Sequence, residues 1–359
     1  MNLNEYMQQG ISLLVKTAGR FYLRNPRGIA FLAKIAPEIR KSAKRREQNE
    51  KDGLHVPPFL IASITSQCNL HCAGCYARAS GACSDSAAEE LSARDWEKIF
   101  SEAASLGTSF AILAGGEPLL RRDVVETAAQ FSNMVFPVFT NGSMLDEDYR
   151  ALFDRCRNLI PIFSMEGGPE ATNERRGAGA YETVREAMSF FHRKRLLFGA
   201  SVTVTKSNIA GVTDAGFVEK LRRDGCGVLF YVEYVPVEPG TEHLLLDDED
   251  VRQMQAAANS LRGRFQDMVI LSFPGDETET DGCLASGRGF FHINAAGGAE
   301  PCPFSPYSAL SLKEHSMREA LQSGFFHELR GLAAQAGHDG GCTLFRHRAE
   351  VEDILDAAK

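Results

Sequence analysis

Three cysteines within eight residues are the feature of this sequence best suited to chemistry. Cys68, Cys72 and Cys75 have the spacing Cys-x3-Cys-x2-Cys and follow the apolar run 58–65. Thiolates are the usual protein ligands of iron–sulfur clusters, and three of them leave one iron of a cubane free for a small chelating molecule. Zinc is the alternative, with His71 as a fourth ligand, although structural zinc sites often use paired Cys-x2-Cys units.

A second group, Gly115-Gly116-Glu117-Pro118, follows the apolar run 109–114. A glycine pair by itself marks only a turn between a strand and a helix. Glycine also lets a ligand approach the main chain closely, and a carboxylate suits an ammonium partner. The sequence therefore leaves two readings of this segment, a plain turn or a ligand-binding turn.

Three later cysteines, Cys283, Cys302 and Cys342, lie in a region rich in Gly, Pro and Phe. These three thiols could hold a metal. Packing as small hydrophobic residues, without any metal, is the alternative. If they hold a cluster, its fourth iron could be open to bind substrate, or its fourth ligand could be a carboxylate or one of several side chains: Cys83, Cys226, His292, His338 or His347.

The elements that must position these groups alternate between apolar, β-rich runs and amphipathic stretches. Strands are predicted at 58–65, 109–114, 134–140, 159–165, 199–205 and 228–235. Helices are predicted at 89–106, 121–131, 146–156, 181–195 and 212–224, with one more at about 247–263. This alternation predicts an α/β fold with a parallel sheet that can curl into a partial barrel, with function at the carboxyl ends of its strands.

The chain divides into three predicted domains. Residues 1–56 form a basic helical segment, 57–245 the barrel, and 246–359 a small cysteine-rich domain. The first segment is expected to contain helices that break near Asn25-Pro26, followed by an exposed polar linker over 41–53. Residues 1–46 carry a net charge of +8 and the rest −16. This asymmetry indicates either a helical cap on the barrel or peripheral contact with a membrane or an acidic partner.

Composition narrows the class of protein. Hydrophobic residues make up 44% of the chain and charged residues 24%, as in ordinary globular proteins. An apolar run long enough to span a membrane is missing from the sequence, and its start does not resemble a secretory signal. The nine cysteines, an odd number, argue against a complete disulfide framework. We therefore expect a cytoplasmic protein, and the acidic remainder argues against binding of nucleic acid.

The cysteine triplet, with Tyr76 directly after it, and the Gly-Gly-Glu after the next strand resemble the radical S-adenosylmethionine (SAM) superfamily. The resemblance covers about residues 57–240 and implies a partial (β/α)6 barrel whose triplet holds a [4Fe–4S] cluster. It also implies that the Gly-Gly-Glu-Pro turn holds the amino group of SAM. Further SAM-binding positions that it implies are Asn141, Ser164, Glu166, Thr203, Thr205, Asn208 and Val235.

The segment from Cys283 to Cys302 resembles the opening of the SPASM extension, or the shorter twitch extension, found behind many radical SAM barrels. That extension carries one or two auxiliary [4Fe–4S] clusters. We interpret the segment here as a β-hairpin whose ends present two thiolates. The resemblance therefore implies one auxiliary cluster on Cys283, Cys302 and Cys342. A full SPASM extension has more cysteines than these, so the match thins after Cys302.

The activity implied by the resemblance is reductive cleavage of SAM to a 5′-deoxyadenosyl radical, which takes a hydrogen atom from a substrate. That substrate is expected to be a peptide, a lipid or a small metabolite, and the electron donor a low-potential protein such as ferredoxin or flavodoxin. The alternative is a non-catalytic iron–sulfur or zinc protein with a degenerate SAM pocket. The complete triplet and Glu117 favour the enzyme, whose catalytic residues the sequence leaves unassigned.

Overall fold

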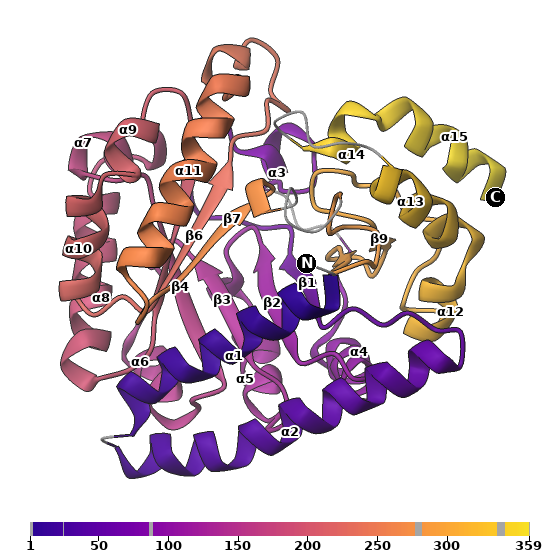
Figure 1. Cartoon of the computed structure of the whole chain (residues 1–359), viewed down its shortest axis with the longest axis horizontal. Helices are drawn as coiled ribbons and strands as arrows, with labels where there is room; N and C mark the ends of the chain where they lie inside the picture. Colours follow the sequence, from indigo (N-terminus) through magenta and orange to yellow (C-terminus); the bar gives the residue numbers. More distant parts are fainter. Residues whose placement is uncertain (1–2, 24, 86–88, 277–281, 336–341, 359) are drawn as a thin grey trace.

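A nine-stranded sheet forms the centre of the computed structural model, which describes residues 3–23, 25–85, 89–276, 282–335 and 342–358. Its strands lie in the order β7-β6-β5-β4-β3-β2-β1-β8-β9, and all pair in parallel except β8 and β9 (Figure 1). The first seven are β1 (Phe59–Thr65), β2 (Phe110–Gly115), β3 (Phe136–Thr140), β4 (Leu159–Met165), β5 (Gly199–Val204), β6 (Val228–Glu233) and β7 (Val269–Phe273).

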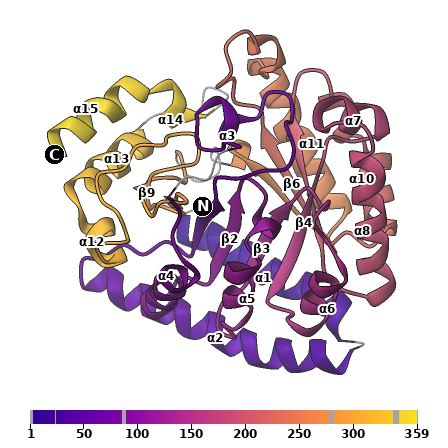
Figure 2. The same cartoon turned by 180° about the vertical axis from the view of Figure 1, so that it is seen from behind.

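Helices cross over between consecutive strands, as parallel pairing requires. They are α4 (Ala93–Leu106), α5 (Arg122–Ala129), α6 (Glu147–Arg155), α8 (Ala180–Lys194), α10 (Ala215–Arg223) and α11 (Asp248–Arg264). Figure 2 shows α4, α5, α6, α8 and α10 around the outer side of the sheet. The predicted α/β fold is confirmed, and each predicted strand and helix is present close to its expected bounds.

The sheet continues past the predicted end of the barrel. β7 extends it at one edge, although residues 269–273 fall in the predicted C-terminal domain. At the other edge, β8 (His292–Ile293) pairs in parallel with β1, and β9 (Ala299–Glu300) completes the predicted hairpin. The division at residue 245 stays a prediction. The helices beyond β9 are α12 (Met317–Gln322), α13 (Gly324–Gln335), α14 (Thr343–Arg346) and α15 (Arg348–Ala358).

A helical hairpin is formed by α1 (Leu3–Tyr22) and α2 (Pro26–Lys51). Asn25 caps α2 by accepting the backbone N–H of Arg27 at 2.9 Å, which explains the break at Asn25-Pro26. The predicted linker over 41–53 is wrong, because most of it is the last part of α2. There Arg46 donates to the carbonyl of Gly107 at 2.5 Å and so caps the carboxyl end of α4.

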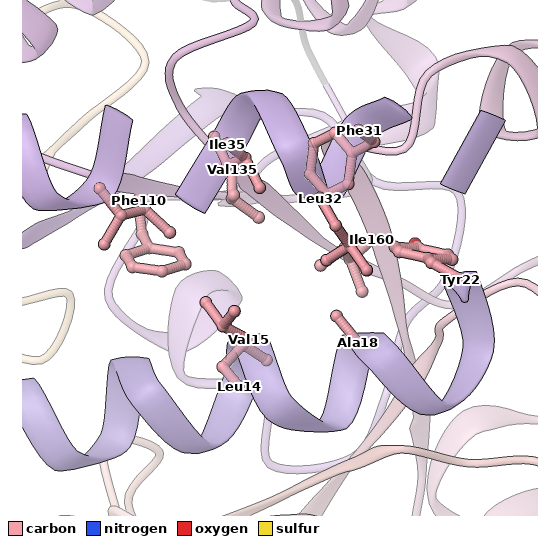
Figure 3. Close-up of a pocket in the computed structure, with 11 residues that line it drawn as sticks. Leu14, Val15, Ala18, Tyr22, Phe31, Leu32, Ile35, Phe110, Val135 and Ile160 are labelled. Atoms are coloured by element: carbon pink, nitrogen blue, oxygen red, sulfur yellow. The ribbon is translucent and has the colours of Figure 1, made fainter. Parts of the chain in front are cut away.

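The helical hairpin packs against the inner face of the sheet at the amino ends of the strands (Figure 1). Ile35 and Ile39 of α2 are buried there with Phe110 and Ile160, the first inward-facing residues of their strands. Figure 3 shows the small apolar pocket left between α1, α2 and the sheet, lined by Leu14, Val15, Ala18, Tyr22, Phe31, Leu32, Ile35, Phe110, Val135 and Ile160. Every helix in the described residues is too short or too polar to cross a bilayer.

Away from the helical hairpin, many side chains on the same inner face are only partly buried. In β1, Leu60, Ala62 and Ile64 are fully buried against the outer helices, so the alternate side chains must point inward. The partly buried inward side chains of the seven strands are Phe59, Ile61, Ser63, Ile112, Ala114, Phe139, Ser164, Thr203, Phe230, Val232, Leu271 and Phe273. The sheet thus presents a largely apolar, partly accessible wall on the side where its strands end.

Candidate active site

The loop that carries the first three cysteines leaves the carboxyl end of β1 and is tied down by charged side chains. Glu90 accepts hydrogen bonds from the backbone N–H of Ser66 at 2.7 Å and from its hydroxyl at 2.9 Å. Arg78, in the short helix α3 (Tyr76–Ala79), donates to the carbonyl of Cys68 at 3.1 Å. Hydrogen bonds from within the protein therefore hold the loop both at its start and at the first cysteine.

The thiols in this loop have unequal surroundings. A hydrogen bond with Cys83 lowers the pKa of Cys68 to about 6, and the same bond raises the pKa of Cys83. Burial raises the pKa of Cys72, and the nearby charges of Arg176 and Arg175 oppose that rise. Because the thiolate is the form that binds metal, the Cys83 contact favours the ligand form of Cys68.

Gly115 and Gly116 bring the end of β2 into backbone contact with the cysteine loop. The N–H groups of Gly116 and Glu117 donate to the carbonyls of Thr65 and Gln67, at 2.9 and 2.8 Å. A Cβ at Gly115 would lie 2.2 Å from the Thr65 oxygen, and one at Gly116 would lie 1.9 Å from the Gln67 oxygen. Both glycines are thus required for the strand to pack against the loop, a reason that does not depend on a ligand.

The carboxylate of Glu117 points into the protein. It accepts hydrogen bonds from the N–H groups of Leu119 and Asn141, at 3.0 and 2.8 Å, and from the Thr140 hydroxyl at 2.7 Å. Burial raises the pKa of Glu117 to about 7. Glu117 therefore joins the end of β2, where the 3-10 turn η1 (Pro118–Leu120) begins, to the end of β3. That Glu117 contacts SAM stays a prediction.

Glu166, at the end of β4, holds a pair of arginines that sequence reasoning missed. Its buried carboxylate accepts from Arg175 at 2.6 Å and from Arg176 at 2.6 and 2.9 Å, and from the backbone of Thr203 at 3.1 Å. Both arginines lie in the last turn of α7 (Pro169–Arg176), and Arg175 also donates to the carbonyl of Ala73 in the cysteine loop at 3.1 Å. The signal in the sequence was the Arg-Arg-Gly after the fourth strand.

The other predicted SAM positions lie at neighbouring strand ends. Asn141 donates to Asn69 of the cysteine loop at 3.0 Å. Asn208 accepts from the backbone of Thr205 at 2.8 Å and donates to the carbonyl of Thr203 at 2.9 Å. In the described part of the chain, Ser164 on β4 makes no hydrogen bond to these positions. Val235 is buried just past β6, and the role of each position in SAM binding stays a prediction.

Tyr234, which the sequence did not single out, lies against the cysteine loop. Gly74 has φ +62°, and a Cβ there would stand 2.5 Å from the Tyr234 hydroxyl. That hydroxyl is buried and has no hydrogen-bond partner among the described residues. Because an unpaired buried hydroxyl is costly, this position fits a ligand that completes the bond.

The three later cysteines come together beside the hairpin of β8 and β9. Cys302 is buried, and its burial, its hydrogen bond with Cys342 and the proximity of Cys283 raise its pKa well above the ordinary value. Two buried hydroxyls in the same segments, Ser286 and Ser305, lack hydrogen-bond partners among the described residues. Nowhere in the described ranges do three His, Cys, Asp or Glu side chains converge on a single-ion site.

The candidate fourth ligands separate in the structure. Cys83 lies beside Cys68, and Cys226 donates to the carbonyl of Val228 at the opposite, amino end of the strands. His292 contacts Ser63 and Glu300, and His347 contacts Glu350. His338 lies outside the described residues.

Tyr76 links the two cysteine groups. Its ring is partly buried and packs on Phe304 with the ring centroids 4.6 Å apart. Burial raises the pKa of its hydroxyl, and the nearby thiols of Cys75, Cys302 and Cys83 act in the same direction. One aromatic side chain therefore lies within electrostatic range of both groups.

Comparisons with known proteins agree with this architecture. Residues 62–222 match the model of the radical SAM superfamily. The chain is 27% identical to the AdoMet-dependent heme synthase of Methanosarcina barkeri over 80% of this chain and 89% of that protein. It is 25% identical to the PqqA peptide cyclase of Rhizobium meliloti, over 79% and 77%. Streptococcus suis SuiB bound to precursor peptide SuiA has a similar fold, with TM-score 0.65 and 14% identity over 81% of this chain and 70% of SuiB.

Residues 62–222 of this chain are a radical SAM domain, and the protein is an enzyme. In this family, SAM bound to a [4Fe–4S] cluster is cleaved reductively to give the radical that takes hydrogen from the substrate. The residues present fit these cofactors. At the end of β1 the pKa of the Cys68 thiol is lowered, and Gly115 and Gly116 let β2 pack closely on the cysteine loop. Beside that loop the Tyr234 hydroxyl has no hydrogen-bond partner among the described residues.

Proposed function

We propose that Cys68, Cys72 and Cys75 hold the cluster that binds SAM. The observation that carries this proposal is that one loop, fixed by Glu90 and Arg78, presents all three thiols where β1 ends. The carboxyl ends of parallel strands are where such folds bind their ligands.

The surrounding residues would offset the charge of the cluster ligands and fix the positions of the strand ends, and would not react themselves. Arg175 and Arg176, held by Glu166, place positive charge beside Cys72 and so offset the negative charge of bound thiolates. Glu117 fixes the end of β3 relative to the Gly-Gly turn, so that ligand-binding backbone at both strand ends keeps one geometry.

We further propose that Cys283, Cys302 and Cys342 hold an auxiliary [4Fe–4S] cluster. Their mutual proximity supports this assignment. The unpaired hydroxyls of Ser286 and Ser305 could donate hydrogen bonds to the sulfur atoms of such a cluster. A low-potential protein such as ferredoxin or flavodoxin would supply electrons.

For the substrate we propose a peptide side chain held against the partly buried side chains of the inner face. The similarity to a peptide cyclase over most of both chains supports this class. In the described residues the edge strands β7 and β9 do not pair, and this side of the barrel is lined by the packed rings of Phe273, Phe290 and Phe304 rather than by main-chain bonds. The aromatic wall there, with Phe139, Phe230 and Phe273, would pack against its side chains.

A tetrapyrrole is the second candidate, favoured by a specific observation. The heme synthase relative is matched over 89% of its length, a larger share than the 77% of the peptide cyclase. A broad apolar wall also suits a flat macrocycle.

The cluster assignments can be tested with a matched pair of variants, C72A and C302A. Anaerobically reconstituted wild type should contain about eight iron atoms per chain, and each variant about four. C72A should lose reductive SAM cleavage by at least 100-fold with dithionite as reductant, while keeping its auxiliary cluster. Retained 5′-deoxyadenosine release by C72A, or zinc in place of iron in oxygen-free wild-type protein, would contradict the proposal.

The substrate classes can be separated by presenting two probes to reconstituted enzyme with SAM. One is a synthetic peptide library with varied central side chains, and the other is iron coproporphyrin III. A mass change in the peptides that depends on SAM supports the first class, and a SAM-dependent mass change in the porphyrin supports the second. Unchanged probes in both arms would reject both classes.

A further inference from the structure

A chain of three polar side chains crosses the junction between the barrel and the C-terminal hairpin. The Ser63 hydroxyl of β1 lies 2.7 Å from Nε2 of His292 in β8. Nδ1 of His292 lies 2.7 Å from the carboxylate of Glu300 in β9. Asn294 donates to the second oxygen of Glu300 at 2.5 Å. The His292 and Glu300 side chains are each only 5% exposed, so this is a buried and fully connected group.

The chain of contacts opens on the inner face of the sheet. Ser63 points inward because its neighbours Ala62 and Ile64 are fully buried on the opposite, helix-covered face. His292 is the register partner of Ile61, another inward residue of β1, so both side chains are on the same face. Ser63 itself is half-buried and borders the partly accessible wall.

Burying an imidazole and a carboxylate here has an energetic cost that packing alone does not justify. Apolar residues of similar volume are often equally stable or more stable at such positions. The arrangement has a chemical meaning, however. A neutral His292 that donates its Nδ1 proton to Glu300 leaves Nε2 free to accept the proton of Ser63.

We propose that Ser63, His292 and Glu300 form a proton relay that accepts a proton from the substrate on the inner face. This inference rests on the proposed function, because it requires a substrate at that face. The substrate's bond to the transferred hydrogen breaks, and its electron pair stays on the substrate. The Ser63 oxygen takes the proton, and the proton that Ser63 carried before passes to Nε2 of His292. Glu300 accepts the hydrogen bond from Nδ1 and so holds the imidazole in the orientation that presents Nε2 to Ser63.

The relay requires His292 to be neutral at rest, which histidine-labelled 15N NMR of the full-length, cluster-loaded protein can test at pH 7.5. We expect a protonated Nδ1 and an unprotonated Nε2, with the signal assigned by its loss in H292Q. His327 is exposed, and H327Q is the matched control that keeps the signal. Protonation of both nitrogens, or of Nε2 alone, would overturn the proposal without touching the SAM-cleavage assignment.

A kinetic readout separates the relay from a purely structural role. With whichever of the two probes gives product, H292Q should lower kcat about 100-fold without raising KM, and added imidazole should restore part of the rate. S63A, which is less disruptive to packing, should lower kcat at least tenfold. Equal kcat in wild type and S63A, or an H292Q defect that imidazole leaves unchanged, would show that the group only holds the hairpin to the barrel.

Discussion

At the scale of single residues, the site is built from side chains whose proton affinities depend on one neighbour or on burial. Cys68 owes its acidity first to Cys83, a residue that lies eleven positions past Cys72 in the sequence and beside Cys68 in space. Glu117 owes its raised pKa to burial. Each effect leads to a measurement on metal-free protein that does not need the substrate.

Replacing Cys83 by alanine should return the Cys68 thiol to an ordinary pKa, because the hydrogen bond that stabilises its thiolate is lost. Alkylation of Cys68 by iodoacetamide at pH 7 should slow roughly tenfold, measured by mass spectrometry of peptides from anaerobic, metal-free protein. C83S, which keeps a hydroxyl donor, should retain much of the wild-type rate. Equal rates for wild type and C83A would contradict this prediction.

Glu117 should make the stability of the protein fall with rising pH. Its pKa of about 7 in the folded state exceeds the unfolded value, so ionisation penalises the folded state as pH rises from about 4.5 to 7. The stability of wild type relative to E117Q should therefore drop by about 3 kcal/mol across that window, at 1.36 kcal/mol per unit. Urea unfolding of both proteins at pH 4.5 and 8 measures the difference. A pH-independent difference would show that Glu117 titrates normally.

At the scale of elements, local pattern predicted the strands well and the contacts between elements poorly. Buried parallel strands are continuous apolar runs, which is why all six predicted strands were found. The polar end of α2 was mistaken for a linker because Arg46 caps α4, whose carbonyls lie some sixty residues away. The cysteine loop was readable because its spacing is local. The Glu166 and His292 networks join strands distant in sequence, and a single sequence carries no direct record of such contacts.

The packing of β2 on the cysteine loop should be intolerant of any side chain at Gly116. A methyl group there would overlap the Gln67 carbonyl, so G116A should push the loop away from its position. We expect iron at the first cluster to fall by more than half, with auxiliary iron retained. Gly168 has open space around its Cβ position, and G168A is the matched control, expected to bind iron like wild type. Normal iron content in G116A would refute the packing argument.

At the scale of the whole molecule, the helical hairpin of α1 and α2 covers the inner face at the amino ends of the strands. This supports the reading of the basic segment as a cap on the barrel, since Arg46 is turned inward and Arg20 pairs with Asp267 at 2.6 Å. Contact with a membrane through residues 1–46 stays a prediction.

Shortening a buried side chain of α2 should lower the free energy of unfolding. Ile35 is 2% exposed, and I35A should lower the free energy of unfolding by about 2–4 kcal/mol through the cavity it leaves. Ile29 in the same helix is 47% exposed, so I29A should cost less than about 1 kcal/mol. Urea unfolding of the two variants compares them directly. Similar losses for both would mean that α2 does not pack on the sheet.

The direct pairing of β8 with β1 has a mechanical consequence. Ile61 donates to the carbonyl of Phe291 at 2.9 Å, so the segment leading to Cys302 is joined to the barrel by main-chain bonds rather than by a flexible tether. A domain movement that separated the two cysteine groups would first have to break the hydrogen bonds between β1 and β8. Admission of a substrate must then depend on movements of loops at the rim, and the spacing between the two groups should stay constant through the catalytic cycle.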